Sequence, residues 1–273
     1  MNLTVCTVNY YTEKYIYFQD YIFRELANNK DYRRLVCNVT PFNEGAEALS
    51  LLPRTEVFYE DTSGLLGSES HGVGLNALIS RIDTEYAVIA DPDSVVLVKD
   101  WDTVCLETLD DQTVAIGTPY PPHAVNRYQG YPNQIFIFFD VAAMRSMDID
   151  FRPENYRLRR AKGQINKYIP WLSFEDRDTS WNMPVKFREH GYLAHCFDFL
   201  KSNDSGSVVL APNARGDEHH WRGIPIVSHQ GRSGSRGFDR DPISILWLDR
   251  ICEFLNIDRQ GISHLIVPKS TKG

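Results

Sequence analysis

The sequence has no apolar run that approaches the ~20 residues of a membrane-spanning helix, so we expect no transmembrane segment. We also expect no secretory leader, because the short apolar start becomes polar at Asn9. An excess of basic residues is also missing, since the formal net charge is −7 at pH 7. That charge disfavours nonspecific binding to nucleic acid, and we expect no nucleic acid as a partner.

Paired cysteines are absent as well. The five cysteines are scattered, odd in number and form no Cys-x-x-Cys pair. Most lie within apolar runs, as small buried hydrophobic residues do in a reducing compartment, and we therefore expect a cytoplasmic protein. What is present is ordinary for a globular chain: 42% hydrophobic and 24% charged residues over 273 positions, enough for one large domain or two small ones.

Strand-like and helix-like segments alternate along the first hundred residues. Apolar, β-branched runs predict strands, and apolar residues at helical spacing predict helices. The predicted strands are 3–8, 35–39, 56–59 and 86–90, and the predicted helices are 15–26 and 70–82. This alternation predicts an α/β fold with a mainly parallel central sheet and helices on both faces. The carboxyl ends of the strands then share one edge, which is where ligands bind in such sheets.

The segment 70–101 carries the strongest chemical signal. Its predicted helix is followed by the buried strand 86–90, and that strand ends at Asp91-Pro92-Asp93. Two nearby carboxylates are hard oxygen ligands suited to Mg²⁺ or Mn²⁺, and at a strand end they would hold the cation against a phosphate. The alternative is a polar turn without a ligand, because Asp and Pro are common turn residues.

The second half continues the alternation less regularly. The predicted strands are 114–117, 134–139, 192–197 and 224–228, and the predicted helices are 141–147, 178–189 and one that opens at Asp241-Pro242. The segment 198–223 is polar, and we expect it to be irregular. Gly191 is expected to end the middle helix, and Asp178 to cap its start. Glu175 and Asp176 then lie just before the positive end of that helix.

These parts, taken in order, resemble the family 2 glycosyltransferases of the GT-A fold over roughly residues 3–238. The matching pieces are the strand end Thr7-Val8-Asn9-Tyr10, the helix and Asp-x-Asp strand from Gly72 to Asp93, Glu175-Asp-Arg-Asp178 before Gly191-Tyr192, and the late strand closing with His229 and a Gly/Ser loop. Two features depart from the family pattern. No obvious Asp for the nucleotide base follows the second strand, and Leu172-Ser-Phe174 replaces the usual Gly-Gly.

The resemblance implies a GT-A type fold with a Rossmann-like nucleotide-binding half. It implies one glycosyltransferase domain over 1–240, with a nucleotide-sugar half at 1–100 and an acceptor half at 101–240. A C-terminal helix and tail follow at 241–273. The implied activity is a metal-dependent, inverting transfer of a sugar from a nucleotide-diphosphate donor to a hydroxyl acceptor. The favoured donor is a UDP-sugar, and a glycan is the expected acceptor, as in polysaccharide biosynthesis.

The resemblance also implies roles for individual residues. Asp91, Asp93 and His229 would hold Mn²⁺ or Mg²⁺, with His219 and His220 as rival ligands to His229. Asp176 would act as general base, and Glu175 would hydrogen-bond an acceptor hydroxyl. The nucleotide sugar would contact Asn9, Tyr10, Asp61, Asn76, Asp91, Arg232 and Arg236.

Two other functions remain as alternatives. A sugar-phosphate nucleotidyltransferase uses a related fold, but it carries a Gly-rich loop after the first strand, where this chain has residues 10–13 without glycine. The other alternative is a catalytically inactive GT-A domain that binds glycans. The presence of both carboxylate clusters argues against that reading.

Overall fold

The computed structural model describes residues 2–122, 124, 127–154, 178–201, 204, 206–210, 216–231, 238 and 241–258. The helices are α1 Glu13–Leu26, the 3₁₀ turn η1 Pro41–Asn43, α2 Ala46–Leu49, α3 Ser68–Arg81, α4 Trp101–Leu106, α5 Val141–Ser146, α7 Met183–His190 and α8 Pro242–Leu255. The strands are β1 Leu3–Asn9, β2 Arg33–Asn38, β3 Thr55–Tyr59, β4 Tyr86–Ala90, β5 Ser94–Val96, β6 Thr113–Pro119, β7 Pro132–Asp140, β8 Leu193–Cys196, β9 Asp198–Lys201, β10 Asp217–Trp221 and β11 Ile224–His229.

The central sheet has seven strands within the described residues, in the order β3-β2-β1-β4-β7-β6-β8. The β1, β2, β3 and β4 strands pair in parallel, and β6 pairs in parallel with β8. Only β7 runs against its two neighbours in this sheet. The expected mainly parallel α/β sheet is therefore confirmed. The carboxyl ends of β1, β3, β4 and β6 lie along one edge.

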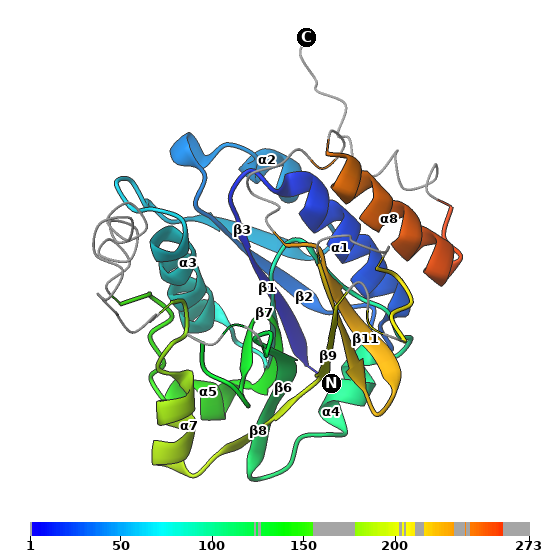
Figure 1. Cartoon of the computed structure of the whole chain (residues 1–273). Helices are drawn as coiled ribbons and strands as arrows, with labels where there is room; N and C mark the ends of the chain where they lie inside the picture. The colour runs from blue at the N-terminus through cyan, green and yellow to red at the C-terminus, as the bar shows by residue number, and fades with distance from the viewer. Residues whose placement is uncertain are drawn as a thin grey trace, which may run out of the picture.

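Helices cover both faces of this sheet. Because its strands are buried on both sides, their sequences are continuous apolar runs. On β4, Val88 and Ala90 pack into one hydrophobic cluster, while Ala87 and Ile89 pack into the other. The α1, α4 and α8 helices cover the first face, and α3, α5 and α7 cover the second (Figure 1). The five cysteines are all unpaired, and four of them are buried.

A second sheet of four antiparallel strands, in the order β5-β11-β10-β9, packs beside the first. Its β9 and β10 strands lie within 198–223, so the expectation of an irregular segment there was wrong. The sequence of β10 gives no apolar alternation because it buries polar groups. The buried Glu218 carboxylate accepts hydrogen bonds from the backbone N–H groups of Val208 and Val209 and from His220. These bonds replace the apolar burial that usually signals a strand.

The helix ends follow the expected capping chemistry with one correction. The Asp241 side chain caps α8 and Pro242 begins it, and Gly191 ends α7 in a left-handed conformation, as predicted. However, α7 starts at Met183 after Asn182, and Asp178 does not cap it. The Asp178 carboxylate instead forms an ion pair with Arg127.

No helix in the described part of the chain is long and apolar enough to cross a membrane.

The close contact between α3 and the chain after α5 gives a test of the packing. A Cβ atom added at Gly72 would lie 2.7 Å from both the Cα of Arg152 and the carbonyl oxygen of Phe151. Overpacking of this kind costs about 1–3 kcal/mol, which exceeds the ~0.5–1 kcal/mol that Ala gains over Gly in a helix. We predict that Gly72→Ala lowers the free energy of unfolding by roughly 1 kcal/mol, measured by urea denaturation. Ser80→Ala, at the exposed end of α3, is the control and should change it by less than about 0.5 kcal/mol.

Candidate active site

The Asp91-Pro92-Asp93-Ser94 segment forms a β-turn at the carboxyl end of β4. The Ser94 backbone N–H donates to the Asp91 carbonyl at 3.0 Å, and Pro92 occupies the second position, where its fixed φ favours the turn. The Asp91 N–H donates to the Ile135 carbonyl of β7 at 3.0 Å, which ties the turn to the neighbouring strand. The turn therefore presents two carboxylates from its first and third positions on a backbone with little freedom.

The second sheet brings His229 to this turn. The β5 strand begins directly after Asp93 and pairs with β11, placing Ser94 opposite His229. The Nε2 atom of His229 lies 3.5 Å from Oδ1 of Asp93. One ligand atom each from Asp91, Asp93 and His229 lies within 4.8 Å of the others. Asp91 and His229 are more than 130 positions apart in the sequence. The structure brings these three residues together, as the resemblance implied.

Two residues that the sequence analysis did not select extend this cluster. The Nε2 atom of His71, in the first turn of α3, lies 3.4 Å from Oδ1 of Asp91. On the other side, the Asp217 carboxylate of β10 lies 3.4 Å from Nδ1 of His229. The Asp91 and Asp93 carboxylates therefore lie between two imidazoles, and Asp217 lies on the far side of the second one. The sequence offered one clue to His71, which is its position at the start of the helix before β4. Asp217 could not be selected, because β10 was not predicted as a strand.

The electrostatics of the cluster favour a bound cation. Burial, followed by the charge of Asp93, raises the pKa of Asp91 from 3.8 to about 7, although His229 opposes this. Burial lowers the pKa of His71 to about 4, because the charge of Asp93 compensates only in part. Oδ1 of Asp91 is buried without a hydrogen-bond partner among the described residues. Two carboxylates, one of which has this unsatisfied oxygen, and one imidazole therefore form a group that could hold a divalent cation.

The rival ligands His219 and His220 lie outside this trio. His220 donates to the buried Glu218 carboxylate at 2.6 Å, which occupies its Nε2 atom. His219 is fully buried, and its two ring nitrogens have no hydrogen-bond partner among the described residues. Burial lowers the pKa of His219 to about 3. Of the three histidines, His229 is the one grouped with Asp91 and Asp93.

The strand ends predicted to contact the nucleotide differ in exposure. Asn9 ends β1 fully buried, and its side chain bonds to Thr12, Glu13 and Asn38. The next residue, Tyr10, is 47% exposed at the same edge. Of these two residues, Asn9 is held inside the protein and Tyr10 is exposed to solvent; their roles in nucleotide binding stay predictions.

The other two predicted nucleotide contacts that the structure describes are Asp61 and Asn76. Asp61 is exposed just after β3, and hydrogen bonds from Ser63 lower the pKa of its carboxyl. The Asn76 amide donates to the Asp150 carboxylate at 2.8 Å and accepts from the Phe151 N–H at 2.9 Å. Asn76 thus joins α3 to the segment after α5. Its role in nucleotide binding stays a prediction.

Four predicted site residues lie outside the described residues: Glu175, Asp176, Arg232 and Arg236. The structure describes the chain again from Asp178, which is fixed near the same edge of the sheet. Tyr120 follows the end of β6, and its hydroxyl donates to the Thr179 carbonyl at 3.2 Å. The Tyr128 ring packs edge-on against Tyr120, with 4.9 Å between ring centroids. The Tyr128 hydroxyl lies 3.0 Å from the Ser180 hydroxyl.

Comparison with known proteins identifies the fold. No protein-family model and no curated protein matches the sequence. S. aureus TarS 1–349 in complex with UDP-GlcNAc matches with a TM-score of 0.50 and 12% identity, over 94% of this chain and 72% of that one. The mannosyltransferase PcManGT from Pyrobaculum calidifontis, in complex with GDP-Man and Mn²⁺, matches with a TM-score of 0.48 and 13% identity, over 71% of this chain.

A galactosyltransferase, LgtC, in complex with donor and acceptor sugar analogs, matches with a TM-score of 0.43 and 12% identity. That match covers 71% of this chain and 73% of the other. The chain spans about half the length of the mannosyltransferase, covering 54% of it. Together with the sheet order described above, the likeness to TarS shows that this chain has a GT-A type fold.

The raised pKa values predict how the site responds to pH. Asp91 and His229 both bind protons more tightly in the folded protein than in the unfolded chain. The metal-free protein therefore loses stability as pH rises, from about pH 4 to 7 for Asp91 and above about pH 6.5 for His229. A metal must displace both protons, and the Asp91 proton alone accounts for about tenfold, so we predict that Mn²⁺ affinity rises at least about tenfold between pH 6 and pH 8. Isothermal titration calorimetry at several pH values measures it, and a constant affinity would contradict the prediction.

Proposed function

We propose that this chain is a metal-dependent, inverting glycosyltransferase that moves a sugar from a nucleotide-diphosphate donor to a hydroxyl acceptor. One observation carries the proposal: Asp91, Asp93 and His229 converge at the carboxyl edge of a GT-A type sheet. Ligands bind at that edge in open α/β sheets. The complex of the similarly folded TarS with UDP-GlcNAc supports a UDP-sugar as the donor, and a glycan is the proposed acceptor.

The residues of the cluster fit a divalent cation, Mn²⁺ or Mg²⁺, held by Asp91, Asp93 and His229. When bound, such a cation neutralises the charge that develops on a departing diphosphate. Asp217 lies against Nδ1 of His229, so Nε2 would be the ring nitrogen that holds the cation. His71 faces Asp91 from α3, where it closes the site on the side of that helix.

The nucleotide half of the proposed domain lies at residues 1–100. There we propose that the Tyr10 ring, which is exposed, stacks on the base, and that the exposed Asp61 accepts hydrogen bonds from the ribose or base. Arg232 and Arg236 follow His229 in the sequence and are proposed to pair with the diphosphate. The acceptor half is proposed to lie at residues 101–240, before the C-terminal helix and tail at 241–273.

The acceptor hydroxyl must lose its proton as it attacks the anomeric carbon. We assign Asp176 as the general base and Glu175 as a hydrogen-bond acceptor for an acceptor hydroxyl. The support for this assignment is the Glu-Asp-x-Asp sequence together with the anchoring of Asp178, two residues later, by Arg127. In-line attack opposite the leaving diphosphate inverts the anomeric centre.

Substitution of the turn carboxylates tests the proposed metal site. We predict that Asp91→Asn and Asp93→Asn each lower Mn²⁺ affinity by more than the ~10–100-fold that loss of an outer-shell partner costs, and abolish Mn²⁺-stimulated turnover. Mn²⁺ binding is measured by electron paramagnetic resonance, and turnover with a panel of UDP- and GDP-sugars. The matched control is Asp83→Asn, which removes an exposed carboxylate that pairs with Arg33 before the start of β4. Wild-type protein that binds neither Mn²⁺ nor any nucleotide sugar would refute the proposed function.

Substitution of the proposed base separates chemistry from binding. We predict that Asp176→Asn lowers kcat by about 10²–10⁴-fold, the range for loss of a general base, while Mn²⁺ and nucleoside-diphosphate affinities stay at wild-type values. The measurements are steady-state kinetics with a glycan acceptor and calorimetric titration of UDP. An unchanged kcat would show that another group removes the proton.

A further inference from the structure

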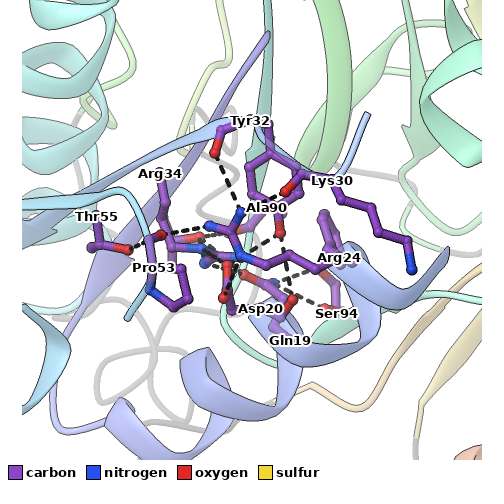
Figure 2. Close-up of polar contacts among 12 residues, drawn as sticks. Gln19, Asp20, Arg24, Lys30, Tyr32, Arg34, Pro53, Thr55, Ala90 and Ser94 are labelled. Atoms are coloured by element: carbon purple, nitrogen blue, oxygen red, sulfur yellow. Dashed lines mark hydrogen bonds and ion pairs between the residues drawn. The ribbon is translucent and has the colours of Figure 1, made fainter. Parts of the chain in front are cut away.

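A buried polar network lies between α1, β1 and β2 (Figure 2), and hydrogen bonds connect it to the Asp91–Ser94 turn. At its centre the fully buried Arg34 of β2 pairs with Asp20 of α1, with 2.7 Å between Nε and Oδ1. Arg24 and the Tyr32 hydroxyl also donate to the Asp20 carboxylate. A buried ion pair contributes little net stability against an apolar core, so its presence here calls for another reason. The neighbouring residue of α1, Gln19, supplies one.

The Gln19 side chain connects this ion pair to the turn. Its carbonyl oxygen accepts from Nη1 of Arg34 at 3.0 Å and from the Thr7 hydroxyl at 3.1 Å. Its amide nitrogen donates to the Asp91 carbonyl at 2.6 Å and to the Ser94 carbonyl at 2.9 Å. A guanidinium can only donate hydrogen bonds, so Arg34 fixes the Gln19 oxygen on its own side. The NH₂ group must therefore face the two turn carbonyls.

The turn is held from a second direction by α8 and β11. The Gln230 backbone N–H donates to the Asp93 carbonyl at 3.0 Å. The Gln230 side chain is itself fixed, because it accepts from the Tyr15 hydroxyl at 2.9 Å and donates to the Ser244 hydroxyl at 2.7 Å. Gln19 and Gln230 thus hold the carbonyls of both carboxylate-bearing residues. Neither contacts the carboxylates themselves in these bonds.

We propose that Gln19 is a positioning residue that sets the spacing of the Asp91 and Asp93 carboxylates through two hydrogen bonds to the turn, and that the buried Arg34 orients it. The proposal rests on the proposed function only for the identity of the ligand at that turn. Because mispositioned ligands weaken metal binding by about 10–100-fold, loss of the Gln19 donors should lower Mn²⁺ affinity within that range.

Two variants and one control separate positioning from general stability. Gln19→Met keeps the size of the side chain and removes both donors. Gln19→Glu keeps the shape and the bond to Arg34 but turns an oxygen toward the two carbonyls. The control is Thr4→Val, which removes the buried 2.7 Å hydrogen bond between Thr4 and Thr84 at the opposite end of β1. All three lose buried hydrogen bonds, but only the Gln19 variants release the turn.

Amide hydrogen exchange of the metal-free protein, followed by NMR at Ser94 and Gln230, is the first measurement. These two N–H groups donate to the turn carbonyls. We expect exchange at both to be at least about tenfold faster in the Gln19 variants than in Thr4→Val of similar melting temperature. Equal exchange in the Gln19 variants and the control would overturn the proposal, because Gln19 would then act only on overall stability.

Mn²⁺ titration followed by electron paramagnetic resonance is the second measurement. We expect both Gln19 variants to bind Mn²⁺ about 10–100-fold more weakly than Thr4→Val. Equal affinity of all variants would also overturn the proposal. Absence of Mn²⁺ binding by wild-type protein would count against the proposed function alone, since the exchange experiment still decides the role of Gln19.

Discussion

Asp91 and Asp93 carry like charges at the end of a buried strand, and the surrounding structure offsets their repulsion. The proline between them fixes a turn in which the two carboxylates must stay close. Imidazoles face the pair from α3 and from β11, and Asp217 balances the second of these. Burial first and the charge of Asp93 second raise the pKa of Asp91, and the charge of His229 opposes this rise only in part. The remainder is what a divalent cation would relieve.

The same repulsion explains why several buried polar side chains hold the turn in place through hydrogen bonds. A flexible turn would let the carboxylates move apart into water, and the site would lose its charge density. Here the turn carbonyls accept bonds from Gln19, Ser94 and Gln230. A charged pair in the core, Arg34 with Asp20, fixes the orientation of the first of these side chains. The buried ion pair in the core therefore helps to set the geometry of the proposed metal site.

The sequence predicted the parts of this fold that depend on local pattern. The β4 strand, the α3 helix and the Asp-x-Asp turn follow from apolar periodicity and turn chemistry, and the resemblance added His229. The parts that failed depend on pairing between distant segments. The β10 strand is held by hydrogen bonds to Glu218 rather than by apolar burial, so neither it nor Asp217 could be predicted. Asp178 has the chemistry of a helix cap, but Arg127 offers it a charged partner instead.

The Asp91–Ser94 turn ends a strand of the large sheet and starts the first strand of the small sheet. The proposed metal site therefore lies where the two sheets meet. The distance between Asp91 and Asp93 is internal to the turn, whereas the distance from Asp93 to His229 crosses from β5 to β11. Sliding of β11 along β5, within the small sheet, would stretch only the second distance. A shift of β11 would thus move His229 relative to Asp93, while Asp91 and Asp93 keep their separation.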